Sequence, residues 1–289
     1  MKKALPLLLF LAVGLSAVFG AESVDEIRKK AEAGDAVAQN NLGWMYHIGD
    51  GVLKDSAEAA KWCRKSAEQG NATAQGSLGW MYTIGDGVPK DPVEAVKWYR
   101  KSAEQGKAHS QYSLGVVYYN GNGVLKDSAE ALTWFRKSAE QGNALAQDSL
   151  GLMYDNGDGV LKDSAEAARW YRKSAEQGNA VAQRSLGVMY ANGDGVQKDS
   201  AEAARWYRKS AEQGNAFAQF KLGVMYGEGN GVLKDWVQAH AWFNNASANG
   251  DEDAKKNLSI LEKEMTPEQK AEATKLAREI LERIQAKKK

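Results

Sequence analysis

Residues 143–178, which read NALAQDSLGLMYDNGDGVLKDSAEAARWYRKSAEQG, contain the pattern that decides the fold. In the first third, Leu150 and Tyr154 fall at the four-residue spacing that places side chains on one face of a helix. The Asn-Gly-Asp-Gly run that follows ends this helix, because Gly, Asn and Asp tolerate a positive φ. A second helical run starts after Asp163 and ends at Gly178, which suits the left-handed position after a helix. The segment therefore predicts two helices, here called helix A and helix B.

Local signals support both helices. Asn143 can cap the start of helix A, and Asp163 can cap helix B with Glu166 at the spacing of a capping box. Gly151 adjoins the apolar face of helix A, where a missing side chain would let helix B approach closely. Trp170 is the largest apolar group in the segment and is expected to fill the space between the helices.

This pattern repeats every 36 residues. The repeated glycines are Gly34, Gly70, Gly106, Gly142, Gly178, Gly214 and Gly250, and the repeated tryptophans are Trp62, Trp98, Trp134, Trp170, Trp206 and Trp242. One helix pair has a single apolar seam and cannot bury a core by itself, so the copies must stack. We therefore predict an all-α solenoid.

The pattern A-x-x-x-L-G-x-M-Y-x-x-G-x-G-V, then K-D-x-x-E-A, then W-Y-R-K-S-A-E-Q-G, resembles the Sel-one-like repeat family, a relative of the tetratricopeptide repeats. The resemblance covers Asp35 to Gly250. It implies a right-handed superhelix of antiparallel helix pairs, and a role in binding other proteins as an adaptor or scaffold. In a cysteine-rich subgroup of this family, which is linked to β-lactam binding, a disulfide joins the two helices of each pair. This chain has a single cysteine, so those properties are not expected of it.

The repeat frame divides the chain into a signal peptide (1–20), an N-terminal capping helix (21–34), six repeats (35–250) and C-terminal capping helices (251–289). The six repeats are 35–70, 71–106, 107–142, 143–178, 179–214 and 215–250. Terminal elements of a solenoid must shield the last apolar face. Ser23-x-x-Glu26 and Thr266-Pro267-Glu268-Gln269 have the spacing of capping boxes. Leu276, Ile280, Leu281 and Ile284 form the apolar stripe of the last helix.

The first twenty residues have the features of an export signal. Lys2 and Lys3 precede an apolar run from Ala4 to Phe19, which is too short to span a bilayer comfortably. We expect cleavage between Gly20 and Ala21, hence a periplasmic or secreted protein with no membrane anchor after cleavage. An uncleaved anchor is the alternative. The mature chain would carry 36 Lys+Arg against 37 Asp+Glu, which gives no electrostatic reason to expect nucleic acid as partner.

Variation between the copies indicates which face could bind a partner. With the helix A leucine at 0°, the constant Ala, Met and Tyr lie within about 60° of it, at about 100° per residue. The positions two and five residues before and after the leucine vary and lie on the opposite face. In the tetratricopeptide relatives helix A lines a concave groove, so this variable face is the predicted groove floor. The candidate partner-binding residues are Trp44, His47, Trp80, His109, Tyr112, Tyr119, Asp148, Asp155, Arg184, Phe217 and Phe220.

Two interpretations stay open for this face. The position two residues after the leucine is apolar in every copy, so Trp44 and Trp80 could either line the groove or pack against the neighbouring copy. For six other members we expect exposure, namely His47, Tyr112, Tyr119, Asp148, Asp155 and Arg184. The Arg-Lys pairs that end each helix B, such as Arg172-Lys173, suit the negative end of the helix dipole and are expected on a solvated face.

The sequence offers no signature of catalysis, cofactor binding or metal binding. Its three histidines occupy different copies and different repeat positions, whereas zinc needs clustered ligands. The turn 155–159 superficially resembles a calcium loop, but the required glycine is displaced. The Gly-x-Gly turns follow helices and not strands, unlike nucleotide-binding loops. We therefore expect a scaffold that binds a protein or peptide. A binder of cell-wall glycan or peptide is the alternative, and an unrecognised hydrolase is a remote one.

Overall fold

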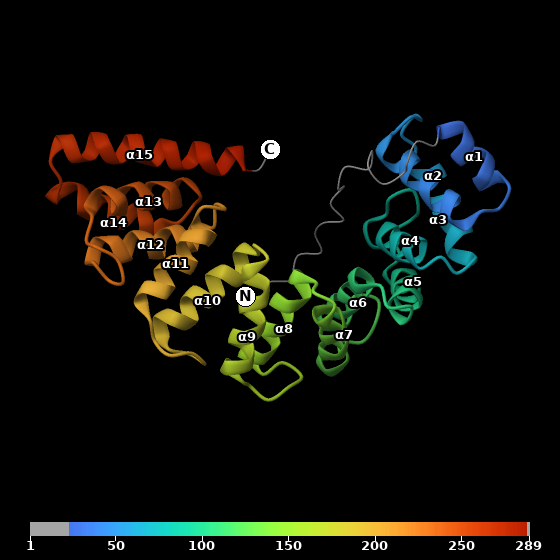
Figure 1. Ribbon diagram of the computed structural model, residues 1–289, viewed down its shortest axis with the longest axis horizontal. Helices are drawn as coiled ribbons and strands as arrows, with labels where there is room; N and C mark the ends of the chain where they lie inside the picture. The colour runs from blue at the N-terminus through green and yellow to red at the C-terminus, as the bar shows by residue number, and fades with distance from the viewer. Residues whose placement is uncertain (1–22, 288–289) are drawn as a thin grey trace. The chain divides into compact units, whose positions relative to one another are not determined.

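The computed structural model describes residues 23–287, and the predicted signal peptide and its cleavage site lie outside this range. The described part is all-helical and contains no strand (Figure 1). Its helices are α1 (Val24–Glu32), α2 (Ala36–Ile48), α3 (Ser56–Glu68), α4 (Ala72–Ile84), α5 (Pro92–Glu104), α6 (Ala108–Asn120), α7 (Ser128–Glu140), α8 (Ala144–Asn156), α9 (Ser164–Glu176), α10 (Ala180–Asn192), α11 (Ser200–Ala211), α12 (Ala216–Glu228), α13 (Trp236–Ala248), α14 (Glu252–Glu264) and α15 (Pro267–Ala286).

The helices pack as consecutive pairs, which makes the fold an α-solenoid. The chain divides into two compact units, with the division between Ala146 and Gln147 near the start of α8. In the first unit α1 packs on α2, and the pairs α2/α3, α4/α5 and α6/α7 follow. In the second unit α9 packs on α10, the pairs α10/α11 and α12/α13 follow, and both α14 and α15 pack on α13. The repeat therefore predicted the helix pairs correctly.

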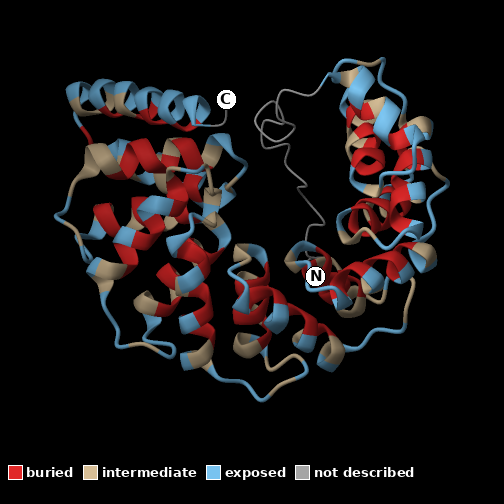
Figure 2. Cartoon of the chain, turned by 45° about the vertical axis from the view of Figure 1, so that its right-hand side comes forward, coloured by how far each residue is buried: buried red, intermediate tan, exposed pale blue. Residues whose placement is uncertain are grey.

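The core of each copy is the constant face of helix A against helix B (Figure 2). The helix A leucines are at most 1% exposed, and the helix B tryptophans are 4–8% exposed. The glycine after each leucine makes this packing possible. A Cβ on Gly151 would lie 2.8 Å from the ring of Tyr171, and a Cβ on Gly187 would lie 2.7 Å from that of Tyr207. The predicted close approach at Gly151 is confirmed.

The helix starts are capped as expected, with one difference. The side chain of Asp163 accepts from the backbone N–H of Glu166. However, Glu166 does not complete a capping box, because its Oε1 accepts from the indole Nε1 of Trp170 at 2.8 Å. Reciprocal capping boxes form at the two ends of the described chain, at Ser23 with Glu26 and at Thr266 with Gln269.

Polar side chains join helix A to helix B within a copy. Gln69 Nε2 donates to Gln39 Oε1 at 2.7 Å, and the same bond recurs 36 residues later between Gln105 and Gln75. Ser66 Oγ, which is buried, donates to the carbonyl of Ala36 at 2.5 Å. These bonds satisfy polar groups that would otherwise be costly to bury, and they fix the register between the two helices of a copy.

Arg64, Arg100 and Arg172 are half-buried, so the expectation of a solvated face was wrong for these three arginines, whereas Arg136 and Arg208 are exposed as expected. Arg172 Nη2 donates to the hydroxyl of Tyr190 in the next copy at 2.6 Å, and its guanidinium lies over the tyrosine ring. The neighbouring lysine also contacts an aromatic ring, since Lys173 Nζ lies 4.0 Å from the centroid of Trp170. The same Arg–Tyr contact recurs at Arg64–Tyr82, Arg100–Tyr118 and Arg208–Tyr226.

The last helix covers α13. On α15, Ile280 and Ile284 are buried as predicted, whereas Leu276 is half-buried and Leu281 is 37% exposed. Asn245 stands where other copies have lysine, and its Nδ2 donates to the carbonyl of Ala277 on α15 at 3.1 Å. The departure of the sixth copy from the repeat pattern thus has a structural reason.

Cys63 takes the place of the aromatic ring that follows the helix B tryptophan in other copies. The thiol is fully buried, and burial raises its pKa to about 12. Since the thiolate is the reactive form, we expect native protein to react with a thiol reagent far more slowly than unfolded protein. The check is labelling with dithionitrobenzoate with and without guanidinium chloride. Equal rates in both conditions would show that the thiol is accessible in the fold.

Candidate binding surface

One position on the variable face of helix A is exposed in every copy, and the six residues at this position are called the exposed line. Five residues before the helix A leucine, every copy places a side chain in solvent, whereas the constant residue one position later is buried. Four members of this line are apolar, and the most exposed is Val37 at 61%. The line consists of Val37, Thr73, His109, Leu145, Val181 and Phe217.

The other variable positions are buried or half-buried. Tyr112 is 8% exposed, and its ring lies 5.8 Å from that of Phe135. The expectation that Tyr112 is exposed was therefore wrong. Its partner in that prediction, Tyr119, is half-buried, and Lys126 Nζ lies 5.3 Å from the centroid of its ring. The variable face thus combines an exposed line with half-buried packing residues.

In the first unit, the structure brings together three candidate residues from two copies. The rings of Trp44 and Trp80 stack with centroids 6.4 Å apart. The ring of His47 lies edge-on to both, at 5.2 Å from each centroid. His47 Nδ1 lies 2.9 Å from Asp86 Oδ2, in the turn after α4. Both tryptophans are half-buried, so they pack against a neighbouring copy and still present aromatic surface.

In the second unit, Asp148, Asp155 and Arg184 occupy half-buried positions on α8 and α10. Asp148 Oδ1 is buried and has no hydrogen-bond partner. Burial raises the pKa of Asp148 to about 6, and the nearby Arg184 guanidinium opposes this shift. Asp148 is therefore a carboxylate held in an unfavourable environment at neutral pH.

This environment gives a pH-dependent prediction for Asp148→Asn. The pKa rises from 3.8 to about 6 on folding, so the unfolded state loses its proton first as pH increases. The carboxylate consequently destabilises the fold progressively between about pH 4 and 6 and fully above. We expect the variant to gain stability relative to the original protein over that range, by at most about 3 kcal/mol. Urea unfolding at several pH values checks this, and a stability difference that does not change from pH 4 to 7 would contradict it.

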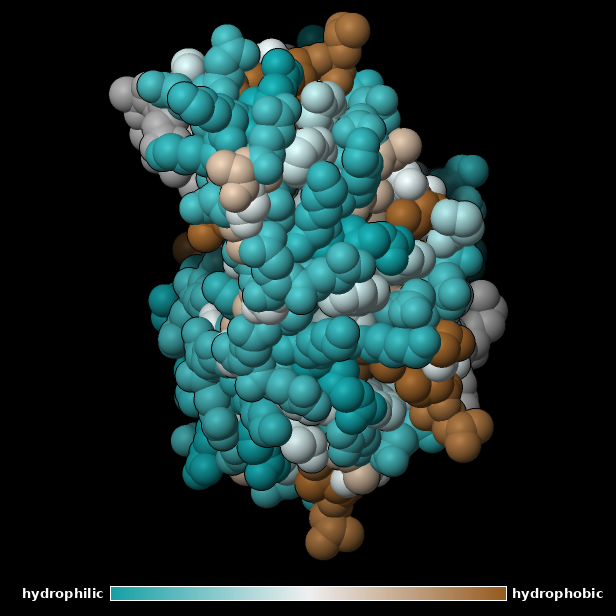
Figure 3. Space-filling model, turned by 90° about the vertical axis from the view of Figure 1, so that its right-hand side faces the viewer, coloured by the Kyte–Doolittle hydropathy of each residue, from teal (hydrophilic) through white to brown (hydrophobic). Residues whose placement is uncertain are grey.

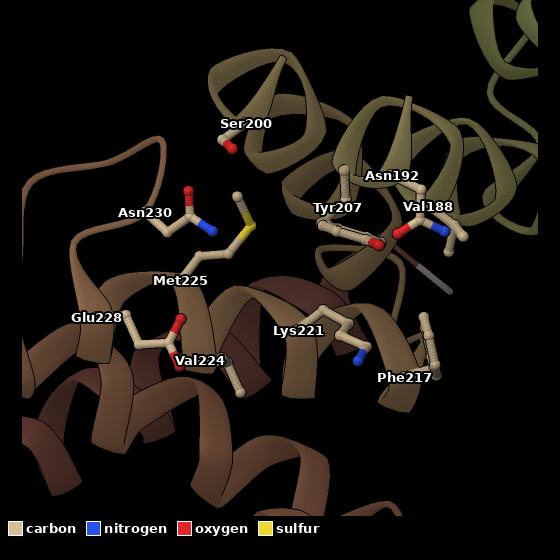
Figure 4. Close-up of a pocket in the computed structure, with 11 residues that line it drawn as sticks. Val188, Asn192, Ser200, Tyr207, Phe217, Lys221, Val224, Met225, Glu228 and Asn230 are labelled. Atoms are coloured by element: carbon tan, nitrogen blue, oxygen red, sulfur yellow. The ribbon is translucent and has the colours of Figure 1, made fainter. Parts of the chain in front are cut away.

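Phe217 and Phe220 lie on α12 and differ in role. Phe220 is half-buried, and its ring packs 5.8 Å from that of Phe243. Phe217 is 39% exposed and borders a pocket of about 280 Å³ between α10 and α12 (Figure 4). Arg184 and Lys221 lie over the Phe217 ring, at 5.9 and 5.3 Å from its centroid.

Sequence reasoning missed several residues of this pocket. It is lined by Val188, Ala191, Asn192, Ser200, Tyr207, Phe217, Lys221, Val224, Met225, Glu228 and Asn230. Four of these, at 188, 191, 217 and 224, belong to the variable face. Lys221 could have been found, because every earlier copy has Ser or Asn directly before the leucine. Tyr207 could not, because it occupies a constant core position.

One face of the molecule is mostly hydrophilic. Figure 3 shows one face on which the protruding hydrophobic side chains are separated from one another. Between residues 23 and 287, no group of three or more His, Cys, Asp or Glu side chains is placed to hold a metal ion. None of the helices in that range combines the length and the hydropathy needed to cross a membrane.

A repeat solenoid with a constant packing face and a variable exposed line is the architecture of a helical-repeat binding protein. The chain belongs to the Sel1 repeat family, whose repeat matches residues 36–71, 72–107, 108–143, 144–179, 180–215 and 216–251. These ranges begin one residue later than the repeats counted from Asp35. Members of this family are generally protein-interaction scaffolds.

Two solved structures are similar over most of the chain. One is c5321, a protective antigen present in uropathogenic Escherichia coli strains and displaying an SLR fold. It is 41% identical over 89% of this chain, with a TM-score of 0.82. This chain covers 56% of that antigen, so it spans little more than half its length. The other is a Sel1 repeat protein from Oxalobacter formigenes, 37% identical over 78% of this chain and 100% of that one, with a TM-score of 0.69. No curated protein is significantly similar.

Proposed function

We propose that this protein is an exported interaction scaffold that binds a partner protein or peptide through the variable face of helix A. The proposal rests on a contrast between the exposed surfaces of helix A and helix B. The exposed surface of helix B repeats the same lysine in five copies, at Lys65, Lys101, Lys137, Lys173 and Lys209. The exposed line of helix A carries a different side chain in almost every copy. A surface that differs from copy to copy can recognise a specific partner, whereas a repeated one offers each copy the same chemistry.

The chemistry of the variable face suits protein recognition. Trp44 and Trp80 present stacked indoles, and Phe217 presents an aromatic ring near two cations. Aromatic and arginine side chains are the usual energetic centres of protein interfaces. Stacked indoles also suit sugar rings, so a cell-wall glycan is the second candidate ligand.

Export is part of the proposal. Its support is the sequence of the first twenty residues, with a basic start, an apolar run and small residues at Val18 and Gly20. The proposed mature protein begins at Ala21 and is periplasmic or secreted.

One experiment tests export and binding together. The tagged full-length chain is expressed in its own host, and the periplasmic and secreted fractions are recovered. We expect mass analysis to give an N-terminus at Ala21, and a bound protein to co-purify at stoichiometric amounts. In parallel, purified cell wall is sedimented with the protein. An intact Met1 would overturn export, and sedimentation with cell wall without any co-purifying protein would favour the glycan alternative.

A further inference from the structure

The pocket between α10 and α12 has opposite charges at its two ends. Lys221, Val224, Met225 and Glu228 all line it from α12, and their spacing of three, four and seven residues places them on one helix face. Figure 4 shows Lys221 beside Phe217 at one end and Glu228 beside Met225 and Asn230 at the other. Among the described residues neither Lys221 nor Glu228 forms an ion pair, so both charges remain available to a ligand.

Apolar side chains line part of this pocket. Val188 on α10 and Val224 on α12 are half-buried, and Tyr207 and Met225 are buried behind them. A volume of about 280 Å³ accommodates one medium-sized apolar side chain together with part of its backbone. At the Lys221 end, Arg184 adds a second cation over the Phe217 ring. This end therefore favours a carboxylate.

The spacing of the charges matches an extended peptide. Seven helical residues separate Lys221 from Glu228, a rise of about 10 Å. Three residues of an extended polyproline II chain cover about the same distance, and this conformation has three residues per turn, so the first and fourth side chains point to the same side. We propose that this pocket binds an extended peptide segment with an acidic side chain near Lys221, a basic side chain three residues away near Glu228, and an apolar side chain between them in the pocket. This inference rests on the proposed function and names the chemistry of the partner.

Alternative occupants fit less well. A purely apolar ligand would leave Lys221 and Glu228 desolvated and unpaired, which is unfavourable. A uniformly acidic peptide would place a like charge near Glu228, and a uniformly basic peptide would place one near Lys221. Asn192, Ser200 and Asn230 at the rim supply polar groups for a peptide backbone, which suits a chain running across the pocket.

The test is selection of random decapeptides displayed on phage against the full-length protein. The expected consensus is an acidic and a basic residue three apart with an apolar residue between them. A second selection uses the charge-swapped variant Lys221→Glu with Glu228→Lys, and the expected consensus has the two charges in the reverse order. A consensus peptide should bind the single variant Lys221→Glu at least about tenfold more weakly, because like charges would meet. Lys255→Glu, on α14 and outside the pocket, makes the same charge change and should bind normally.

Circular dichroism of each variant controls for folding. No enriched peptide, a consensus without paired charges, or one unchanged by the charge swap would overturn the inference. Two further outcomes distinguish failure of this inference from failure of the proposed function. If a partner co-purifies with the original protein and equally well with Lys221→Glu, only the pocket assignment falls. If neither peptides nor a partner bind, both fall.

Discussion

Replacing Trp206 by Ala is expected to lower the free energy of unfolding by about 3–5 kcal/mol, the range for truncating a buried tryptophan. Its ring is 8% exposed and packs among Tyr171, Leu186 and Met189 of the preceding helices. Truncation would therefore open a cavity between two copies. Since each repeat is stabilised by its neighbours, we expect the loss to affect the adjoining copies as well.

The neighbouring Arg205 provides a matched control. It is exposed and forms a surface ion pair with Glu202 at 2.6 Å. Such pairs contribute about 1 kcal/mol or less, so Arg205→Ala should unfold almost normally. Chemical unfolding followed by circular dichroism makes the comparison. Equal losses for the two variants would mean that Trp206 does not fill the space between copies.

Gly195→Ala is expected to have the second large effect. Gly195 has a φ of +67°, and an added Cβ would lie 2.1 Å from the carbonyl oxygen of Ser164. That atom belongs to the main chain at the start of helix B in the preceding copy, so it cannot rotate away. The variant would lose about 1–2 kcal/mol to the left-handed backbone, and about 1–3 kcal/mol more to the clash.

Gly178→Ala separates these two causes. Gly178 also has a positive φ, of +94°, but no atom lies within 4 Å of the added Cβ. It should therefore show the conformational cost alone. Urea unfolding of both variants gives the difference. If Gly178→Ala were as destabilising as Gly195→Ala, contact between copies would not be the reason for the second glycine of each turn.

Much of the fold could be predicted from the sequence, because the repeat shows each structural position several times. The positions of Leu150 and Gly151 in the core followed from spacing alone, and so did the cap at Asp163. The partners of polar side chains could not be predicted. Glu166 has the spacing of a capping box and instead accepts from an indole, because Trp170 lies one turn further along the same helix face.

Contacts with other helices were the main gap in predicting the candidate site. A helical wheel places Tyr112 opposite the packing face of its own helix, but it omits the helices that pack beside it. Tyr112 is buried beside Phe135, which lies on helix B of the same copy. The same limitation hid the bond from Arg172 to Tyr190, whose partners are 18 residues apart. Lys221 departs from the Ser or Asn of the earlier copies, but only the structure shows that it shares a pocket with Glu228.

We infer that the constant face of helix A stabilises the fold and that the exposed line of helix A binds the partner. The most direct test is partner binding by a variant with Ala at all six positions of that line, measured by titration with the co-purified partner. The changed residues are Val37, Thr73, His109, Leu145, Val181 and Phe217. Because exposed substitutions usually change stability by about 0.5 kcal/mol or less, the melting temperature should change by only a few degrees. We predict that binding is lost while the fold is retained. A variant that folds and binds its partner with unchanged affinity would contradict the account.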